Sequence, residues 1–139
     1  MNAYVDSSVL LRLLLHEPNR LKEFGGLGQA VTSEIAEVEV LRTLDRIRLT
    51  ENRPDAGLMA LRRRTFELLA VLEVVHLTGP VVRRAADPFP AVIRTLDALH
   101  LATAMVWRDH ATMVDFRFAT HDTAQAAVAA AVGFEVIGI

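Results

Sequence analysis

The chain has 139 residues, of which 52% are hydrophobic and 23% are charged, and its formal net charge is −2. This length and apolar content predict a single folded domain, residues 1–139, with a sizeable core, and they argue against disorder. The sequence has no cysteine, which excludes disulfides and thiolate metal sites, and the small net charge argues against non-specific nucleic-acid binding over the whole surface.

The first residues, MNAYVDSS, lack the basic and then apolar segments of a signal peptide. The apolar runs are far shorter than the ~20 residues of a membrane span. We therefore expect a cytoplasmic chain with no membrane contact.

The predicted elements of the first half are two short strands and four helices. The apolar runs 3–5 and 30–32 predict buried strands. Helical periodicity, with Pro18 and the Asn52–Pro54 segment as breaks and Ser33 as an N-cap, predicts the helices. These cover residues 8–15, 19–27, 34–49 and 54–70.

The second half continues the alternation of strand and helix. Strands are predicted at 71–75, within 113–120 and at 135–137. Helices are predicted within 78–90, at 95–107 and at 122–132, with Gly133 as the last C-cap. This alternation indicates an α/β fold, a three-layer α/β/α sandwich with a mostly parallel sheet.

Two acidic residues directly follow predicted strands. Asp6 ends the first strand, and Asp122 follows the strand-like run FRFAT. Because parallel strands end at one edge of the sheet, where such folds bind ligands, both carboxylates should emerge there. Each one alone is more simply interpreted as an ordinary helix N-cap, and the pair together is the informative feature.

Asp97 lies in TLDALHLATAMVW, a helix that is apolar on nearly every face and should be buried. A buried carboxylate needs a cation beside it. That cation is either a metal ion or Arg94, which precedes Asp97 by three residues.

The helix at 34–49 should supply a fourth acid, and periodicity leaves two choices. Ala36, Val40 and Leu44 form one apolar stripe at ~100° per residue. Glu37 flanks this stripe more closely than Glu39 does, so periodicity slightly prefers Glu37.

Carboxylates that converge on one edge require a cation, and an oxygen-only set suits Mg²⁺ or Mn²⁺ rather than zinc. His100 is interpreted as a hydrogen-bonded core residue and not as a metal ligand. Carboxylate-bound divalent ions commonly serve phosphoryl chemistry, including phosphodiester cleavage by water.

Four blocks of the sequence carry a family resemblance: YVDSSVLLRLL, VTSEIAEVEVLRTL, TLDALHLATA and FATHDTAQAAVAAAVGFEVI. Together they resemble the PIN-domain ribonucleases, and among these the VapC-type toxins of toxin–antitoxin pairs. The likeness implies a Mg²⁺- or Mn²⁺-dependent endoribonuclease of PIN fold. It also implies RNA as substrate, an antitoxin (VapB-like) as partner, and a homodimer.

The resemblance also implies roles for individual residues. The catalytic and metal-binding acids carried over from the matching blocks are Asp6, Glu39, Asp97 and Asp122. Here the motif favours Glu39 over Glu37, against the helical periodicity. Polar neighbours of the site would be Thr120, Ser8 and the extra acid Asp115.

Two further features gain candidate roles. Arg42 and Arg46 share a helix face with Glu39 and could hold RNA phosphates, or they could be solvated or paired with Glu39 and Asp45. Apolar surface on the early helices could receive an antitoxin helix.

Two alternatives remain open from the sequence. The first is an aspartyl-phosphate enzyme, in which Asp6 would be the nucleophile. Such sites use a lysine to hold the phosphoryl group, and the only lysine of the chain, Lys22, lies away from any strand end. The second alternative is a PIN-fold module that binds a partner without cleaving RNA. The presence of all four acids counts against this alternative.

Overall fold

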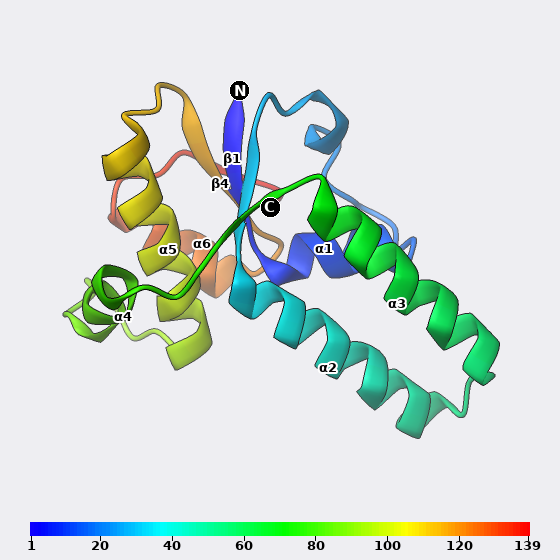
Figure 1. The fold of residues 1–139 in the computed structure, drawn as a ribbon. Coiled ribbons are helices and arrows are strands. Elements are labelled where there is room, and N and C mark those ends of the chain that lie inside the picture. The colour runs from blue at the N-terminus through cyan, green and yellow to red at the C-terminus, as the bar shows by residue number, and fades with distance from the viewer.

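The computed structural model describes residues 1–139 and contains one five-stranded sheet with helices on both faces (Figure 1). The strand order is β3-β2-β1-β4-β5, and every pair of neighbours is parallel. The predicted three-layer α/β/α fold is therefore confirmed, with a sheet that is parallel throughout.

The elements follow the predicted order closely. The strands are β1 Asn2–Val5, β2 Ala30–Ser33, β3 Glu73–Val75, β4 Phe116–Ala119 and β5 Val136–Ile137. The helices are α1 Ser7–Leu14, α2 Glu34–Glu51, α3 Asp55–Ala70, α4 Gly79–Ala86, α5 Thr95–Ala111 and α6 Thr123–Ala131. None of these helices combines the length and the apolar character that a membrane-spanning segment requires.

The core is divided between the two faces of the sheet, because successive side chains of a strand point to opposite faces. Ala3 and Val5 pack in a cluster with residues of α1, α2 and α3. Tyr4, between them in sequence, packs with residues of α5 and α6 on the other face. Figure 1 shows the two helical layers on either side of the central strands.

The predicted helix over residues 19–27 is wrong. That segment contains only a short 3₁₀ helix, η1 (Phe24–Gly26). His16 and Asn19 adopt left-handed backbone conformations, with φ of 52° and 58°. Three glycines between residues 25 and 28 lower the helical propensity further.

The chain reverses direction across the sheet at β1. It builds β2 and β3 on one side of β1 and then returns to place β4 and β5 on the other side. In open parallel sheets, binding sites form beyond the carboxyl ends of the strands at such a reversal. The turns from β1 into α1 and from β4 into α6 lie there, and the start of α2 follows the neighbouring strand β2.

Candidate active site

Asp6 is the innermost acid at this edge. It is only 3% exposed, and its backbone N–H donates to Ala119 O of the neighbouring strand. Ser8 Oγ donates to Asp6 Oδ1 at 2.6 Å, and Val9 N–H donates to the same oxygen at 3.2 Å. Burial raises the pKa of Asp6, and the hydrogen bonds from Ser8 and Thr120 oppose that rise.

Asp122 lies at the matching position after β4. Its Oδ1 accepts the Gln125 N–H at 2.9 Å, so it caps α6 as Asp6 caps α1. Thr120 joins the two turns, because its hydroxyl donates to Asp6 Oδ2 at 2.7 Å and accepts the Asp122 N–H at 3.0 Å. Both acids are therefore helix caps and also lie together at one edge of the sheet, as predicted.

Asp97 lies in the first turn of α5, and its cation in the structure is Arg94. Arg94 Nε donates to Asp97 Oδ2 at 2.9 Å, and Arg94 Nη2 donates to Asp122 Oδ2 at 3.2 Å. The hydrogen bond and charge of Asp97, and then the charge of Asp122, raise the pKa of Arg94. One guanidinium thus brings together carboxylates from α5 and from the start of α6.

Glu39 of α2 contacts His100 of α5 through Oε1 and Nε2. The other ring nitrogen, His100 Nδ1, lies 2.6 Å from the Tyr4 hydroxyl, and both rings are buried. The interpretation of His100 as a hydrogen-bonded core residue is therefore confirmed. Burial, and then the charges of Asp6 and Glu39, raise the pKa of Tyr4.

The donor set fits a divalent cation. Arg94 is itself a positive group shared by two carboxylates, and the surrounding donors are oxygen atoms, which Mg²⁺ and Mn²⁺ prefer. In the structure, no three His, Asp or Glu side chains converge tightly enough to bind an ion together. An ion bound by Asp97 and Asp122 would therefore replace the Arg94 side chain, which is 77% exposed.

A cavity of about 470 Å³ opens beside Asp122, and its walls also include Ser8 and Arg46. Arg12 and His121 line both this cavity and a neighbouring one of about 490 Å³, which also holds Arg20 and Lys22. Arg46 forms no ion pair, whereas Arg42 pairs with Asp45 at 3.0 Å. The paired alternative for Arg42 is therefore the observed one.

The structure separates Asp115 from the other acids. Asp115 precedes β4, at the amino end of the parallel strands, and it pairs there with the Met1 amino group at 3.5 Å and with Arg117 at 3.0 Å. Asp6 and Asp122 lie at the carboxyl ends. The suggestion of Asp115 as an extra site acid is corrected, because it stands at the wrong edge of the sheet.

Two contacts at the site were not predicted from the sequence. The bond between Arg94 and Asp122 spans 28 positions, and the contact between Glu39 and His100 spans 61. Both join separate elements, so no local spacing reveals them. The sequence indicates these contacts only indirectly, because Arg94 lies three residues before Asp97 and His100 lies three residues after it.

Comparison with known proteins identifies the family. The family model of the PIN domain matches residues 3–131. Ribonuclease VapC47 of Mycobacterium tuberculosis is 35% identical over 108 residues, which cover 73% of this chain and 73% of that protein. The chain belongs to the PIN-domain family of VapC ribonucleases. Ribonuclease VapC46 of the same species is 34% identical and is covered to 72%.

Solved structures agree with this PIN fold. A toxin–antitoxin complex from Klebsiella pneumoniae aligns with a TM-score of 0.68 and 18% identity, over 98% of this chain and 96% of that one. Mycobacterium tuberculosis VapC20, described as a toxin that cleaves the sarcin–ricin loop, aligns with a TM-score of 0.65 and 17% identity, over 99% and 100%. The VapC membership confirms the resemblance and the prediction of a toxin-class ribonuclease, and it argues against an aspartyl-phosphate enzyme.

Proposed function

We propose that the chain is the toxin of a toxin–antitoxin pair and hydrolyses RNA phosphodiesters with Mg²⁺ or Mn²⁺ held by Asp6, Glu39, Asp97 and Asp122. The main support for this metal site is that Asp97 and Asp122 both bind one cationic group, the Arg94 guanidinium. When bound, a divalent ion supplies charge stabilisation at the phosphate and lowers the pKa of a water molecule.

The protein's own contribution is to fix the acids in place. Ser8 and Thr120 each donate to a different oxygen of Asp6, which sets the orientation of that carboxylate. The cap bond to Gln125 leaves Asp122 Oδ2 for a cation. We therefore include Ser8 and Thr120 as supporting residues of the proposed site.

We propose that RNA phosphates lie along the two adjoining cavities. Arg46 lines the first cavity together with Asp122, and Arg12, Arg20 and Lys22 line the second. Arg12 pairs with Glu17 at 3.7 Å and Arg20 lies 3.4 Å from His16 Nδ1, whereas Arg46 and Lys22 form no ion pair. Unpaired positive side chains suit phosphate oxygens, contacts that position RNA without reading its sequence. Arg46 is the favoured contact, and Arg42, with its charge already shared with Asp45, is secondary.

We propose a cognate antitoxin (VapB-like) as the protein partner. One similar structure is a toxin–antitoxin complex. Between α1 and α3 this chain has a hollow of about 220 Å³ lined by Leu13, Leu14, Phe24 and Leu68, which suits the apolar side of a helix. We also propose a homodimer, in which a second copy covers the exposed Val92 and Leu96; sedimentation velocity tests it.

The decisive experiment compares two aspartates at opposite edges of the sheet. Purified protein with Mn²⁺ should cleave a structured RNA, and Asp97→Asn should abolish cleavage while the circular dichroism spectrum stays unchanged. Asp115→Asn, the matched control, should cleave at the wild-type rate. A wild-type protein that binds Mn²⁺ and RNA but never cleaves would favour the binding-module alternative.

A further inference from the structure

A buried polar chain links the interior of the sheet to the proposed metal site. It runs from the Tyr4 hydroxyl to His100 Nδ1 at 2.6 Å, and from His100 Nε2 to Glu39 Oε1. His100 is 1% exposed and Tyr4 is fully buried, whereas the Glu39 side chain is 22% exposed. The chain of contacts therefore begins in the core and ends at a carboxylate that reaches solvent.

The donors and acceptors along this chain define one arrangement of protons. An ionised Glu39 carboxylate can only accept, so His100 Nε2 donates to it. A neutral imidazole then has Nδ1 as its acceptor, and the Tyr4 hydroxyl supplies the matching donor. Both ring nitrogens of His100 thus have a partner, and the ionised Glu39 carboxylate selects the tautomer that carries the proton on Nε2.

The His100 ring is also held rigidly. Tyr4 stacks on Phe118 with ring centroids 5.2 Å apart, and it meets His100 edge to face at 5.9 Å. Glu39, in contrast, lies on α2 with its side chain 22% exposed. A rigid donor at Oε1 restricts the carboxylate and leaves Oε2 for another partner.

We propose that His100 is a positioning residue that holds Glu39 through Nε2, so that Oε2 stays available to the divalent ion of the proposed active site. This inference rests on the proposed function, because it assumes that Glu39 is a metal ligand. It assigns His100 a role through Glu39 and no direct contact with metal or RNA. Partners of this kind around metal ligands typically affect metal affinity about 10- to 100-fold.

Two substitutions of His100 separate this role from packing. In His100→Gln the amide lies near the position of Nε2 and can still donate to Glu39. In His100→Asn the amide lies near Nδ1, where it can accept from Tyr4 but does not reach Glu39. Mn²⁺ affinity, measured by electron paramagnetic resonance, should fall about tenfold or more in His100→Asn and stay near wild type in His100→Gln.

Thr103→Val is the matched control for damage to α5. Thr103 is buried on the same helix, and its hydroxyl bonds only to Leu99 O at 2.7 Å. This variant should lower the melting temperature without changing Mn²⁺ affinity. In the double variant Glu39→Gln/His100→Asn, affinity should be no lower than in Glu39→Gln alone, because His100 acts through Glu39.

The possible outcomes are distinguishable. If wild type binds Mn²⁺ and Glu39→Gln weakens it, but folded His100→Asn binds as tightly as wild type, the role of His100 is overturned and the metal site stands. Equal losses in His100→Asn and His100→Gln would also overturn it, in favour of packing. If wild type binds no Mn²⁺, both the site and the role of His100 are overturned.

Discussion

Thr120 and Asp6 are joined by a 2.7 Å hydrogen bond although 114 positions separate them. The same Thr120 hydroxyl accepts the Asp122 N–H, so one side chain relates the two turns that carry acids at the carboxyl edge of β1 and β4. Because Asp6 is almost fully buried, its second oxygen depends on this bond for a partner.

Replacing Thr120 by valine should destabilise the protein. The variant has a side chain of the same shape but no hydroxyl for Asp6 Oδ2, and a hydrogen bond to a charged group contributes about 1.5–3 kcal/mol. We expect the free energy of unfolding in urea to fall by about that amount. Thr120→Ser, which keeps the hydroxyl, should recover most of it. A valine variant as stable as wild type would contradict the account of this bond.

Replacing Arg94 by glutamine should tighten Mn²⁺ binding. The Arg94 guanidinium competes with a metal ion for Asp97 and Asp122, and an exposed ion pair of this type is weak because solvent screens it. Its removal should raise the Mn²⁺ affinity by up to about fivefold in calorimetric titration. Arg53→Gln removes a comparable exposed pair with Glu51 and should have no effect. Weaker Mn²⁺ binding after loss of Arg94 would count against competition.

Arg46→Ala should weaken RNA binding without changing the fold. One lost phosphate contact reduces the slope of log affinity against log salt by about 0.7–0.9. We expect a higher KM for RNA and a smaller salt slope, with kcat nearly unchanged. Arg48, on the same helix but paired with Asp45 at 2.9 Å, provides the control variant Arg48→Ala. An unchanged salt slope would remove Arg46 from the RNA path.

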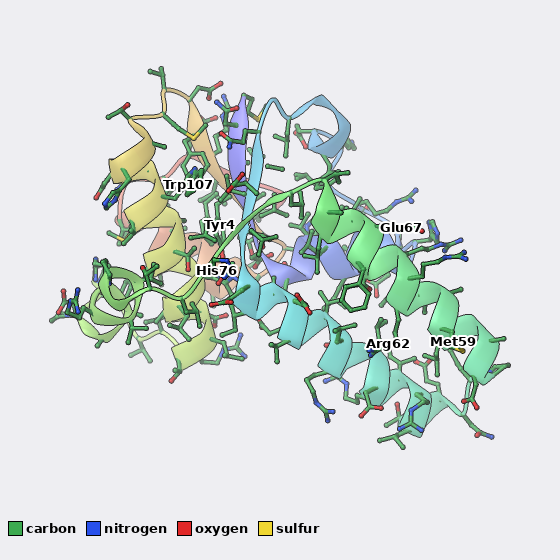
Figure 2. The ribbon with its side chains drawn as sticks, in the orientation of Figure 1. Tyr4, Met59, Arg62, Glu67, His76 and Trp107 are labelled. Carbon is green, nitrogen blue, oxygen red and sulfur yellow. The ribbon has the colours of Figure 1, made fainter.

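Glu34 makes stability depend on pH. Leu77 N–H donates to Glu34 Oε1 at 2.5 Å and His76 Nδ1 lies 3.1 Å from Oε2, and these bonds lower the pKa of Glu34 from its ordinary 4.5. Figure 2 shows His76 beside the start of α2. Since the folded-state pKa is the lower one, this stabilisation is complete above about pH 4.5 and is lost as the pH falls through the folded-state pKa.

The corresponding test is a series of thermal melts between neutral and acidic pH. Wild type should lose melting temperature more steeply than Glu34→Gln below about pH 4.5. Glu67→Gln serves as the control, because it alters an exposed carboxylate on α3 that is labelled in Figure 2. Parallel curves for wild type and Glu34→Gln would contradict the assignment.

Most of the fold could be predicted because local patterns and packing agree. Short apolar runs became β1 and β2, and Ser33 caps α2 through Ile35 N–H as its position suggested. The prediction of a helix at 19–27 was wrong because the helical spacing of its apolar residues does not overcome several glycines and the left-handed backbone of Asn19. Asp115 was misplaced because the strand begins after it, not before it.

The choice between Glu37 and Glu39 shows the limit of periodicity. Both residues are half-buried on α2, so the position of the stripe does not separate them. The difference lies in a partner 61 positions away, His100, which contacts Glu39. Such a contact depends on how α5 packs against the end of β2, and only the tertiary structure provides it.

The hydrogen bond between Thr120 and Asp6 also determines when, during synthesis of the chain, the carboxyl edge of the sheet can be completed. A ribosome synthesises Asp6 early, but the Thr120 and Asp122 turn that completes the edge appears 114 positions later. A nascent chain still lacking β4 has only part of the proposed acid set in place. Translation therefore delays assembly of the proposed metal site until most of the polypeptide has emerged.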